Sequence, residues 1–423
     1  MDIFSKCNTT EGNFGDLRAQ GDRFFTRPTL SPNTGRTTVF NNNTCIMWSA
    51  NNYLGLANNP EVQEVANQAV QEYGVSNPMG SRMMSGTTEH HLAFERALAE
   101  FSRKESAYLF NYGYMGVLGV IAAIATKQDI IVMDKLAHSC IIDGAFLSQA
   151  TIRIFRHNNM NSLESILKRI PQDGSQGTLI VTEGVYGMTG DLAPLGDIVA
   201  LKKQYNARLF VDDAHGCGVM GAQGRGTADH LGVQEDVDIY FGTFAKSFAG
   251  IGGFAASLKN VIEWIGYNAR TQVFAKSLPM IYVATMRKML ELIIEGGDLR
   301  EKVWKTSNTL KKGLRNAGFF VGPGESPICS VFLPLHSRDL VELAQNCMRF
   351  LRDEGIFVSV VAYPVIPLGL CMFRLIPTTE HTSEDVEETV RKFTHMRDTL
   401  KLDLNLEKDD RTKLEQLYGP IID

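Results

Sequence analysis

The sequence predicts an α/β fold with a mainly parallel sheet that is covered by helices on both faces. Short apolar segments of strand length alternate with helical patterns along most of the 423 residues. Several of these segments, such as residues 209–211, are continuously apolar, which is typical of strands buried on both faces. The length allows one large core and a smaller second domain.

The elements follow in chain order. Helical patterns cover Pro60–Tyr73 and Glu89–Phe101, and a Thr-Thr-Glu cluster typical of a helix N-terminus opens the second. Residues 262–290 are predicted to be helical with a turn near 277–279, and a further helix begins near Leu292. Seven strands are predicted for the main sheet, at residues 106–110, 130–133, 152–155, 179–182, 209–211, 237–241 and 253–256.

The last third of the chain predicts a smaller α+β domain, with strands at residues 328–333, 357–361 and 371–376 and helices between them. The residues before Trp48 are polar and rich in Asn and Thr, which indicates an arm lying over the body or over a partner subunit. We therefore expect four parts, namely an N-terminal arm (1–55), a large cofactor-binding domain (56–295), a small C-terminal domain (296–400) and a charged tail (401–423).

Composition excludes several classes of protein. The 42 Lys and Arg residues against 47 Asp and Glu residues give a net charge of −5, without the basic excess of a nucleic-acid-binding protein. The 7 cysteines form no CxxC pair, which favours reduced thiols in the cytoplasm and no metal site. The apolar stretch at residues 117–125 is too short to span a bilayer, and the first residues do not resemble a signal peptide.

Two predicted strand ends carry the main candidate catalytic residues. Lys246 follows the strand at residues 237–241, among small and hydroxylated neighbours. A lysine in this setting can hold a carbonyl cofactor as a Schiff base, although most lysines are only solvated surface groups. The strand at residues 209–211 delivers Asp212 and His215 at its carboxyl end, where open α/β sheets bind ligands. Because pyridoxal phosphate chemistry needs an amine and a carboxylate on the ring nitrogen, these residues predict a pyridoxal-phosphate enzyme.

A candidate phosphate site lies at the start of the next predicted helix. Gly113, Tyr114 and Met115 follow the strand at residues 106–110, and free amides at a helix N-terminus favour a phosphate. Thr243 offers a hydroxyl to the same group. The alternatives are an ordinary glycine turn and a β-branched strand residue.

Two further residues are candidates on weaker grounds. His138 follows a strand end, and its imidazole would stack on a flat pyridine ring; the alternative is a surface histidine with its hydrogen bonds satisfied. Arg374 is a charge inside the apolar strand at residues 371–376. Because a buried arginine is unfavourable without an anionic partner, a substrate carboxylate is the functional interpretation.

Six ordered motifs show a resemblance to a known family. The chain resembles the α-oxoamine synthases, which are fold-type-I pyridoxal-phosphate transferases and include serine palmitoyltransferase, 8-amino-7-oxononanoate synthase, 5-aminolevulinate synthase and 2-amino-3-ketobutyrate ligase. The likeness covers residues 49–395. The motifs that carry it are NNYLGL (51–56), GSRMMSGT (80–87), HSCIIDG (138–144), TEGVY (182–186), DDAHG (212–216) and GTFAKS (242–247).

The resemblance implies the reaction and a role for each matched residue. The reaction would be a decarboxylative condensation of an amino acid with an acyl thioester. Lys246 would bind the cofactor and move the α-proton, and Asp212 would pair with the ring nitrogen. The implied contacts are His215 with the ring hydroxyl, His138 with the ring face, Gly113, Tyr114, Met115, Thr243, Lys276 and Ser277 with the phosphate end, and Asn51, Ser81 and Arg374 with the substrate.

Within the family the sphingolipid-forming branch is the most similar, with three departures. Gly187 replaces a hydroxyl residue, Lys276 brings a cation into a loop that is rich in Ser or Thr elsewhere, and residues 362–367 replace the usual loop before the substrate arginine. These departures resemble bacterial cysteate fatty acyltransferases of sulfonolipid synthesis. A sulfonate keeps its charge and gains from a cation, so the resemblance implies L-cysteate with a long-chain acyl thioester on acyl carrier protein or coenzyme A.

Several alternatives remain at this point. The substrate could instead be serine, as in serine palmitoyltransferase, or alanine with a pimeloyl thioester, as in the biotin pathway. A non-catalytic partner subunit would lack the lysine, but Lys246 is present. A transcription regulator would need a DNA-binding domain before residue 49, and no basic recognition helix is predicted there. The resemblance also implies a homodimer whose active sites are completed across the interface.

Overall fold

The computed structural model describes residues 2–10, 15, 25–32, 35–334, 340–363 and 365–419. The chain divides into two compact units. The larger unit comprises Asn51–Gly187 and Asp191–Lys302, and the smaller unit comprises Met1–Ala50, Met188–Gly190 and Val303–Asp423. The four-part division expected from the sequence stays a prediction, and part of its tail, residues 420–423, lies outside the described residues.

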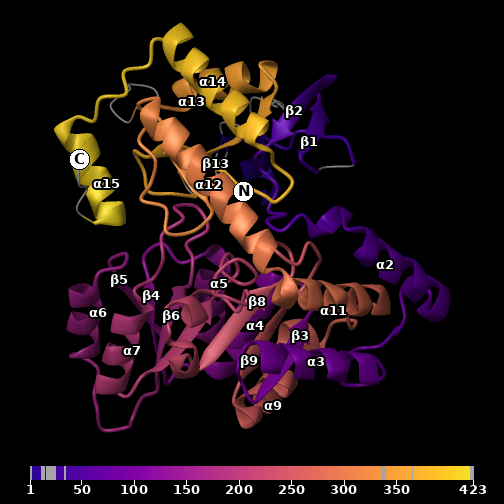
Figure 1. Cartoon of the computed structure of the whole chain (residues 1–423). Coiled ribbons are helices and arrows are strands. Elements are labelled where there is room, and N and C mark those ends of the chain that lie inside the picture. Colours follow the sequence, from indigo (N-terminus) through magenta and orange to yellow (C-terminus); the bar gives the residue numbers. More distant parts are fainter. Residues whose placement is uncertain are drawn as a thin grey trace. The chain divides into compact units, whose positions relative to one another are not determined.

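A seven-stranded sheet forms the centre of the larger unit (Figure 1). Its order is β3-β9-β8-β7-β6-β4-β5. The strands are β3 (Ser106–Phe110), β4 (Ile130–Asp134), β5 (Thr151–Phe155), β6 (Thr178–Glu183), β7 (Arg208–Asp212), β8 (Ile239–Thr243) and β9 (Gly253–Ser257). Strands β5, β4, β6, β7 and β8 pair in parallel, whereas β9 is antiparallel to both β3 and β8. The predicted mainly parallel seven-stranded sheet is confirmed, and the direction of β9 is an addition to it.

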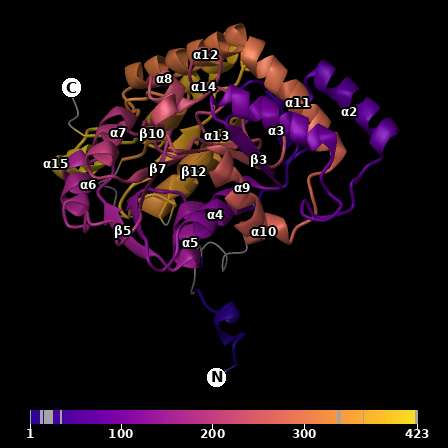
Figure 2. The ribbon, with the colours of Figure 1, turned by 90° about the horizontal axis from the view of Figure 1, so that it is seen from below.

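Helices cover both faces of this sheet. Figure 2 shows β3 and β7 between a layer with α3 and α7 and a layer with α4 and α5. Strands β4, β8 and β9 are buried along their whole length, as their apolar sequences require. The helices of the larger unit are α2 (Pro60–Tyr73), α3 (Glu89–Phe101), α4 (Gly113–Ile124), α5 (Ser139–Ser148), α6 (Met160–Leu167), α7 (Leu195–Gln204), α8 (Thr227–His230), α9 (Lys259–Asn268), α10 (Arg270–Val273) and α11 (Met280–Glu295), and α12 (Gly297–Asn316) runs into the smaller unit.

Local sequence explains where these helices begin and end. The Thr88 side chain accepts a hydrogen bond from the His91 amide and caps α3, as the Thr-Thr-Glu cluster predicts. The helical stretch predicted from residue 262 is divided into α9, α10 and α11, with a break at Ala269 that the sequence analysis does not predict. The helix predicted to begin near Leu292 begins at Gly297, because α11 continues to Glu295.

A buried ion pair holds the segment between α2 and α3. Arg82 donates to both carboxylate oxygens of Glu95, at 2.7 and 3.0 Å, and both side chains are buried. Glu95 also accepts the amide of Leu109 on β3 at 3.0 Å. This bidentate pair therefore fixes the loop that includes the candidate residue Ser81 against the sheet.

The smaller unit contains two three-stranded sheets, ordered β1-β2-β11 and β10-β13-β12. Strands β1 and β2 lie in the part of the sequence expected to form an arm, and were not predicted. They form a hairpin with Asn41 and Asn42 at its turn, both in the left-handed region (φ 48° and 61°), as type I′ turns require. The elements are β1 (Thr37–Phe40), β2 (Asn43–Met47), β10 (Cys329–Phe332), β11 (Ile356–Phe357), β12 (Ser359–Ala362), β13 (Cys371–Leu375), α13 (Leu340–Asp353), α14 (Ser383–Thr399) and α15 (Lys408–Tyr418).

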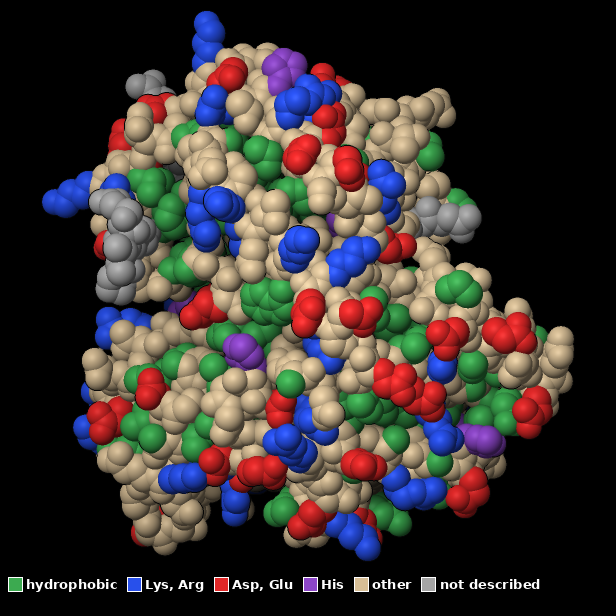
Figure 3. Space-filling view, viewed as in Figure 1, with side chains coloured by type: hydrophobic (Ala, Val, Ile, Leu, Met, Phe, Trp, Pro, Cys, Tyr) green, Lys and Arg blue, Asp and Glu red, His purple; other side chains and the backbone are tan. Residues whose placement is uncertain are grey.

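The surface is mixed in charge. On the face drawn in Figure 3, Lys and Arg side chains are interspersed with Asp and Glu side chains. In the described part of the chain the seven cysteines form no disulfide. Among the described residues, no helix has both the length and the apolar character needed to cross a bilayer.

Candidate active site

The carboxyl ends of β6 and β7 bring two buried acids together. Asp212 is the last residue of β7 and pairs in register with Glu183, the last residue of β6. Asp212 is only 4% exposed, and its carboxylate accepts the amide of Ala214 at 3.1 Å. Burial raises the pKa of Asp212, whereas the charges of Lys246 and His138 lower it. A carboxylate in this position is stabilised by a cation beside it.

Lys246 lies at the same edge of the sheet. It follows β8, the strand next to β7 in the sheet, and its side chain is half-buried. Its positive charge lowers the pKa of Asp212, Glu183 and His138, so all three lie within its electrostatic reach. The structure therefore brings together the lysine and the carboxylate that the strand ends predict.

Glu183 is a site residue to which the sequence analysis assigns no role. Its Oε1 accepts the amide of His138 at 2.9 Å, and its Oε2 accepts the amide of Gly187 at 3.4 Å. Burial raises the pKa of Glu183, the charge of Asp212 adds to this effect, and Lys246 opposes it. One side chain thus links the turn before α5 to the loop after β6.

His138 is the N-cap residue of α5 and is exposed. Its Nδ1 accepts the amide of Cys140 at 3.3 Å and lies 3.0 Å from the Cys140 sulfur. Burial lowers the pKa of His138, and Lys246 lowers it further against the opposing charge of Asp212. The Cys140 thiol also contacts Asp212, with Sγ and Oδ2 3.7 Å apart. Burial raises the pKa of Cys140, so this thiol stays protonated and donates.

His215 is held between a tyrosine and a glycine. Its Nδ1 is 2.9 Å from the hydroxyl of Tyr53, a residue of the first motif that the sequence analysis leaves without a role. A Cβ atom at Gly187 would overlap the His215 ring at Nε2 and Cδ2. The replacement of a hydroxyl residue by Gly187 therefore has a physical consequence, because the backbone itself packs against the histidine.

The candidate phosphate residues also meet. A Cβ atom on Gly113 would lie 2.7 Å from Thr243 Oγ1, so the start of α4 and the end of β8 touch. Tyr112, which precedes α4, caps no amide with its side chain, and the exposed residues Tyr114 and Met115 follow in the first turn. This end of α4 keeps its amides available for an anion.

The segment at residues 274–279 packs against the segment at residues 80–86. Ser277 donates its amide to the Gly80 carbonyl at 2.8 Å, and Lys276 pairs with Ser81 in an antiparallel bridge. The Asn111 side chain donates to the Lys276 carbonyl. Ser277 Oγ is buried and has no hydrogen-bond partner among the described residues. Three predicted site residues therefore lie together, close to the loop that precedes Gly113.

Two predicted substrate residues lie in different units. Asn51 is the first residue of the larger unit and is half-buried. Arg374 lies on β13 of the smaller unit, opposite Ser330 and Ser359 in the two neighbouring strands. Their roles stay predictions. Pro364, in the loop that the sequence analysis compares with the family, lies outside the described residues.

The larger unit thus fits a flat pyridine ring that carries a phosphate. It provides a buried carboxylate for a ring nitrogen at Asp212, a lysine at Lys246 and open helix amides at Gly113. The buried hydroxyl of Ser277, which lacks a partner in the described structure, adds a donor. These are the groups that such a cofactor needs from a protein.

Comparisons with known proteins agree with this geometry. Residues 43–393 match the family described as aminotransferase class I and II. The chain is similar to a cysteate-C-fatty acyltransferase of Capnocytophaga ochracea (43% identity; 95% of each chain) and to an 8-amino-7-oxononanoate synthase of Alkaliphilus oremlandii (35%; 95% of this chain and 100% of the other). Its fold is similar to that of a solved serine palmitoyltransferase from S. paucimobilis with a bound PLP-myriocin aldimine (30%; TM-score 0.87; 95% and 100%).

We expect the Glu183→Gln variant to change how stability depends on pH. Because the folded pKa of Glu183 is raised, the folded state holds a proton that the unfolded state releases above about pH 4.3. Native stability therefore falls as pH rises from that value to the folded pKa of about 8, and glutamine removes this contribution. Thermal unfolding without cofactor should show the melting temperature of Glu183→Gln improving relative to native protein as pH increases. Glu100→Gln, an exposed change on α3, is the control; a difference for Glu183→Gln that is constant with pH contradicts the prediction.

Proposed function

Because the chain belongs to the aminotransferase class I and II family, and within it to the α-oxoamine synthases, we propose that it condenses L-cysteate with a long-chain fatty acyl thioester, using pyridoxal 5'-phosphate. The observation that carries this proposal is the buried Asp212 carboxylate within electrostatic reach of Lys246 and His138. The similar cysteate acyltransferase and the PLP-containing serine palmitoyltransferase structure support the substrate and the cofactor.

Each candidate residue of the larger unit has a separate role in the proposed reaction. The bound cofactor supplies an electron sink for the substrate α-carbon. Asp212 would keep a proton on the ring nitrogen, and His138 would lie against the ring. The amides at Gly113 would bind the phosphate, and so would the Thr243 hydroxyl, which in this structure donates to the Gly252 carbonyl at 3.1 Å. Lys246 would hold the cofactor through its amine and would act as the general base for the α-proton.

The overall reaction balances without a further reactant. The α-carbon of the amino acid loses its proton and its carboxyl group, the latter as carbon dioxide, and a proton from the solvent takes the place of the carboxyl group. A carbon–carbon bond forms between this α-carbon and the acyl carbonyl carbon, and the carrier leaves as a free thiol after taking up a proton. The product is an aminoketone that keeps the side chain of the amino acid, which for cysteate is a sulfonate.

The position of Lys276 supports cysteate as the amino acid. Lys276 is paired through the backbone with Ser81, a candidate substrate residue, so the segment that carries the additional cation lies beside the predicted amino-acid site. A sulfonate is ionised at every physiological pH and gains from such a cation, whereas the neutral hydroxyl of serine gains little. Serine with a palmitoyl thioester is the second candidate, and alanine with a pimeloyl thioester is the third. Acyl carrier protein and coenzyme A are both suitable carriers.

We also propose a cytoplasmic homodimer with active sites shared between subunits. Exposed apolar side chains at the start of α4, the end of α5 and the end of α10 support it: Tyr112 (55% exposed), Phe146 (67%), Leu147 (57%) and Phe274 (75%). Helices α4 and α5 pack together, and α10 packs on α4. Phe274 begins the segment that contains Lys276 and Ser277, so a partner seated there would lie next to the site.

Lys246→Ala should abolish turnover and covalent attachment of the cofactor. Alanine has no amine with which to hold the carbonyl group or to take the α-proton. Borohydride reduction followed by peptide mass spectrometry should detect the cofactor on the Lys246 peptide of the native enzyme only. Lys259→Ala, an exposed lysine at the start of α9, is the control and should keep both properties. Substantial turnover by Lys246→Ala would contradict the proposed function.

Native enzyme should prefer L-cysteate to L-serine by about 10- to 150-fold in kcat/KM. This range corresponds to a charge-assisted hydrogen bond of about 1.5–3 kcal/mol. Both amino acids are measured with the same long-chain acyl carrier protein, and alanine and glycine complete the panel. Lys276→Gln should remove the preference while changing the serine value little. An equal loss for both amino acids would assign Lys276 to the phosphate instead, and serine at or above cysteate would make the chain a serine palmitoyltransferase.

The native protein should sediment as a dimer, and Phe274→Glu should weaken this association at least tenfold, because the change places a charge in an apolar interface. Analytical ultracentrifugation over a range of concentrations measures the dissociation constant. Leu231→Glu is the matched control, since Leu231 is also exposed but follows α8, on the other side of the larger unit from α10 (Figure 2). A native monomer, or equal effects of the two variants, would argue against this interface.

A further inference from the structure

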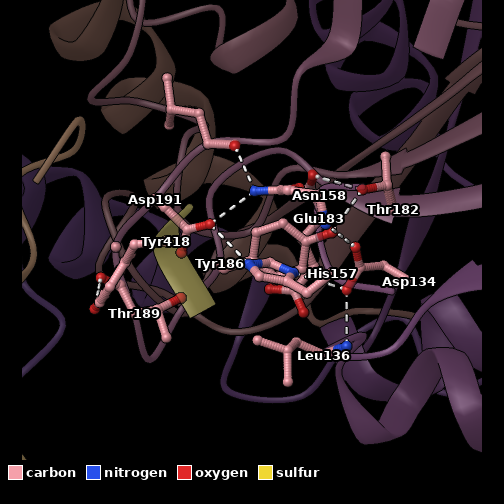
Figure 4. Close-up of polar contacts among 12 residues, drawn as sticks. Asp134, Leu136, His157, Asn158, Thr182, Glu183, Tyr186, Thr189, Asp191 and Tyr418 are labelled. Carbon is pink, nitrogen blue, oxygen red and sulfur yellow. Dashed lines mark hydrogen bonds and ion pairs between the residues drawn. The ribbon is translucent and has the colours of Figure 1, made fainter. Parts of the chain in front are cut away.

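A buried histidine connects three neighbouring strand ends beside the site. His157 follows β5, and its Nδ1 and Nε2 lie 2.9 Å from Asp134 Oδ1 and 2.9 Å from Asp191 Oδ2. Asp134 ends β4, and Asp191 lies in the loop after β6; Figure 4 shows the two carboxylates on opposite sides of the ring. Because each ring nitrogen faces a carboxylate, both nitrogens donate and the ring is an imidazolium.

The charge of His157 is strongly stabilised. Burial lowers the pKa of His157, but the hydrogen bonds and negative charges of Asp134 and Asp191 outweigh burial and raise it to about 10. The histidine side chain is 3% exposed, and those of Asp134 and Asp191 are 0% and 6% exposed. Water therefore screens this group little, and two buried carboxylates depend on one cation.

Asn158, in the same turn as His157, also binds both Asp134 and Asp191. Its amide donates to Asp134 Oδ2 at 3.0 Å, and its side-chain nitrogen donates to Asp191 Oδ2 at 2.8 Å. Its backbone is in the left-handed region (φ 48°), which asparagine adopts more readily than most residues. The turn after β5 is thus shaped so that two consecutive residues bind both carboxylates.

Asp134 is hydrogen-bonded to the turn that precedes His138. Asp134 Oδ1 accepts the amide of Leu136 at 2.8 Å, and the Asp134 carbonyl accepts the amide of Ala137 at 3.1 Å. His138 is the next residue, and its own amide is bound by Glu183. The orientation of Asp134 therefore sets the turn that places the His138 ring.

Asp191 is hydrogen-bonded to the loop that contains Gly187, which packs against His215. The Asp191 carbonyl accepts the amide of Tyr186 at 3.0 Å, and the Tyr186 ring meets the His157 ring edge-on, with centroids 4.5 Å apart. Gly187 follows Tyr186 and packs against the His215 ring. Both histidines that face the proposed cofactor are thus connected, within a few residues, to the same imidazolium.

We propose that His157, bound between Asp134 and Asp191, is a positioning residue that holds the turns of His138 and Gly187 in the arrangement that binds the cofactor. The inference rests on the proposed function, since it concerns the same site. A neutral residue at position 157 leaves two buried carboxylates without their cation. Their repulsion would separate the turn after β4 from the loop after β6, and both ring-contacting histidines would shift.

The test compares His157→Gln with native enzyme by binding and spectroscopy as well as by turnover. We expect apo His157→Gln to bind pyridoxal 5'-phosphate about 10- to 100-fold more weakly in a fluorescence titration, as shifts on the order of 1 Å produce. The circular dichroism band of the bound cofactor should decrease. At saturating cofactor kcat should fall, while KM for the acyl thioester should change less than threefold.

A second ion cluster, at the amino ends of β7 and β8 in the same sheet, provides the matched control. Lys202 and Arg208 pair with Asp238, which also accepts the amide of Leu209 at 2.7 Å near the amino end of β7. Lys202→Gln removes one cation from this cluster, far along the strands from the proposed site. Lys202→Gln should lower the melting temperature, as we also expect of His157→Gln. Unlike His157→Gln, it should leave cofactor affinity and the dichroism band at native values.

Asp191→Asn serves as the milder variant if His157→Gln does not fold, because asparagine keeps an oxygen that accepts from His157. It should change cofactor affinity and dichroism in the same direction by a smaller factor. Native affinity and dichroism in a folded His157→Gln, or in Asp191→Asn where His157→Gln is unfolded, would overturn the inference and leave a purely structural role. A native protein that does not bind pyridoxal 5'-phosphate would instead overturn the proposed function.

Discussion

The site depends on one constraint, which is that a carboxylate at the end of a central strand is buried and needs a cation. Asp212 ends β7, in the middle of the sheet, where neighbouring strands exclude water from both sides. Lys246 comes from the adjacent strand end, and His138 from the turn after β4. Because all of these strands are parallel, their carboxyl ends lie at one edge, so three segments far apart in sequence meet without a long loop.

Much of this arrangement follows from sequence, and for a physical reason. A strand buried on both faces is an apolar run, and a polar residue directly after it lies at a sheet edge. Asp212 ends such a strand and Lys246 follows one after a short turn, so their positions are predictable once a parallel sheet is expected. The contact of Gly113 with Thr243 is predictable in the same way, because each follows or ends a strand.

What could not be predicted depends on strand order and direction. His157 meets Asp134 and Asp191 only because β4 lies between β5 and β6, and the apolar pattern of a strand does not reveal its neighbours. The antiparallel direction of β9 could not be predicted from the sequence for the same reason. The hairpin at Asn41 and Asn42 had a local signal, since two asparagines suit a type I′ turn, but its strands are too polar to be recognised by periodicity.

The distribution of charge also explains how such a site could bind the anionic end of the cofactor and that of the substrate at different places. Two groups of buried acids already lie near a cation, Asp212 near Lys246 and the pair around His157 near its imidazolium, whereas burial raises the pKa of Glu183 to about 8. A further lysine placed among them would pair with a carboxylate rather than with a ligand. The anionic ends of the proposed cofactor and substrate must therefore find donors elsewhere, and the start of α4 offers neutral amides that no acid competes for. Lys276, on the separate segment beside Ser81, is a further cation, and its presence bears on the choice of amino acid, while Arg374 stays the candidate for the substrate carboxylate.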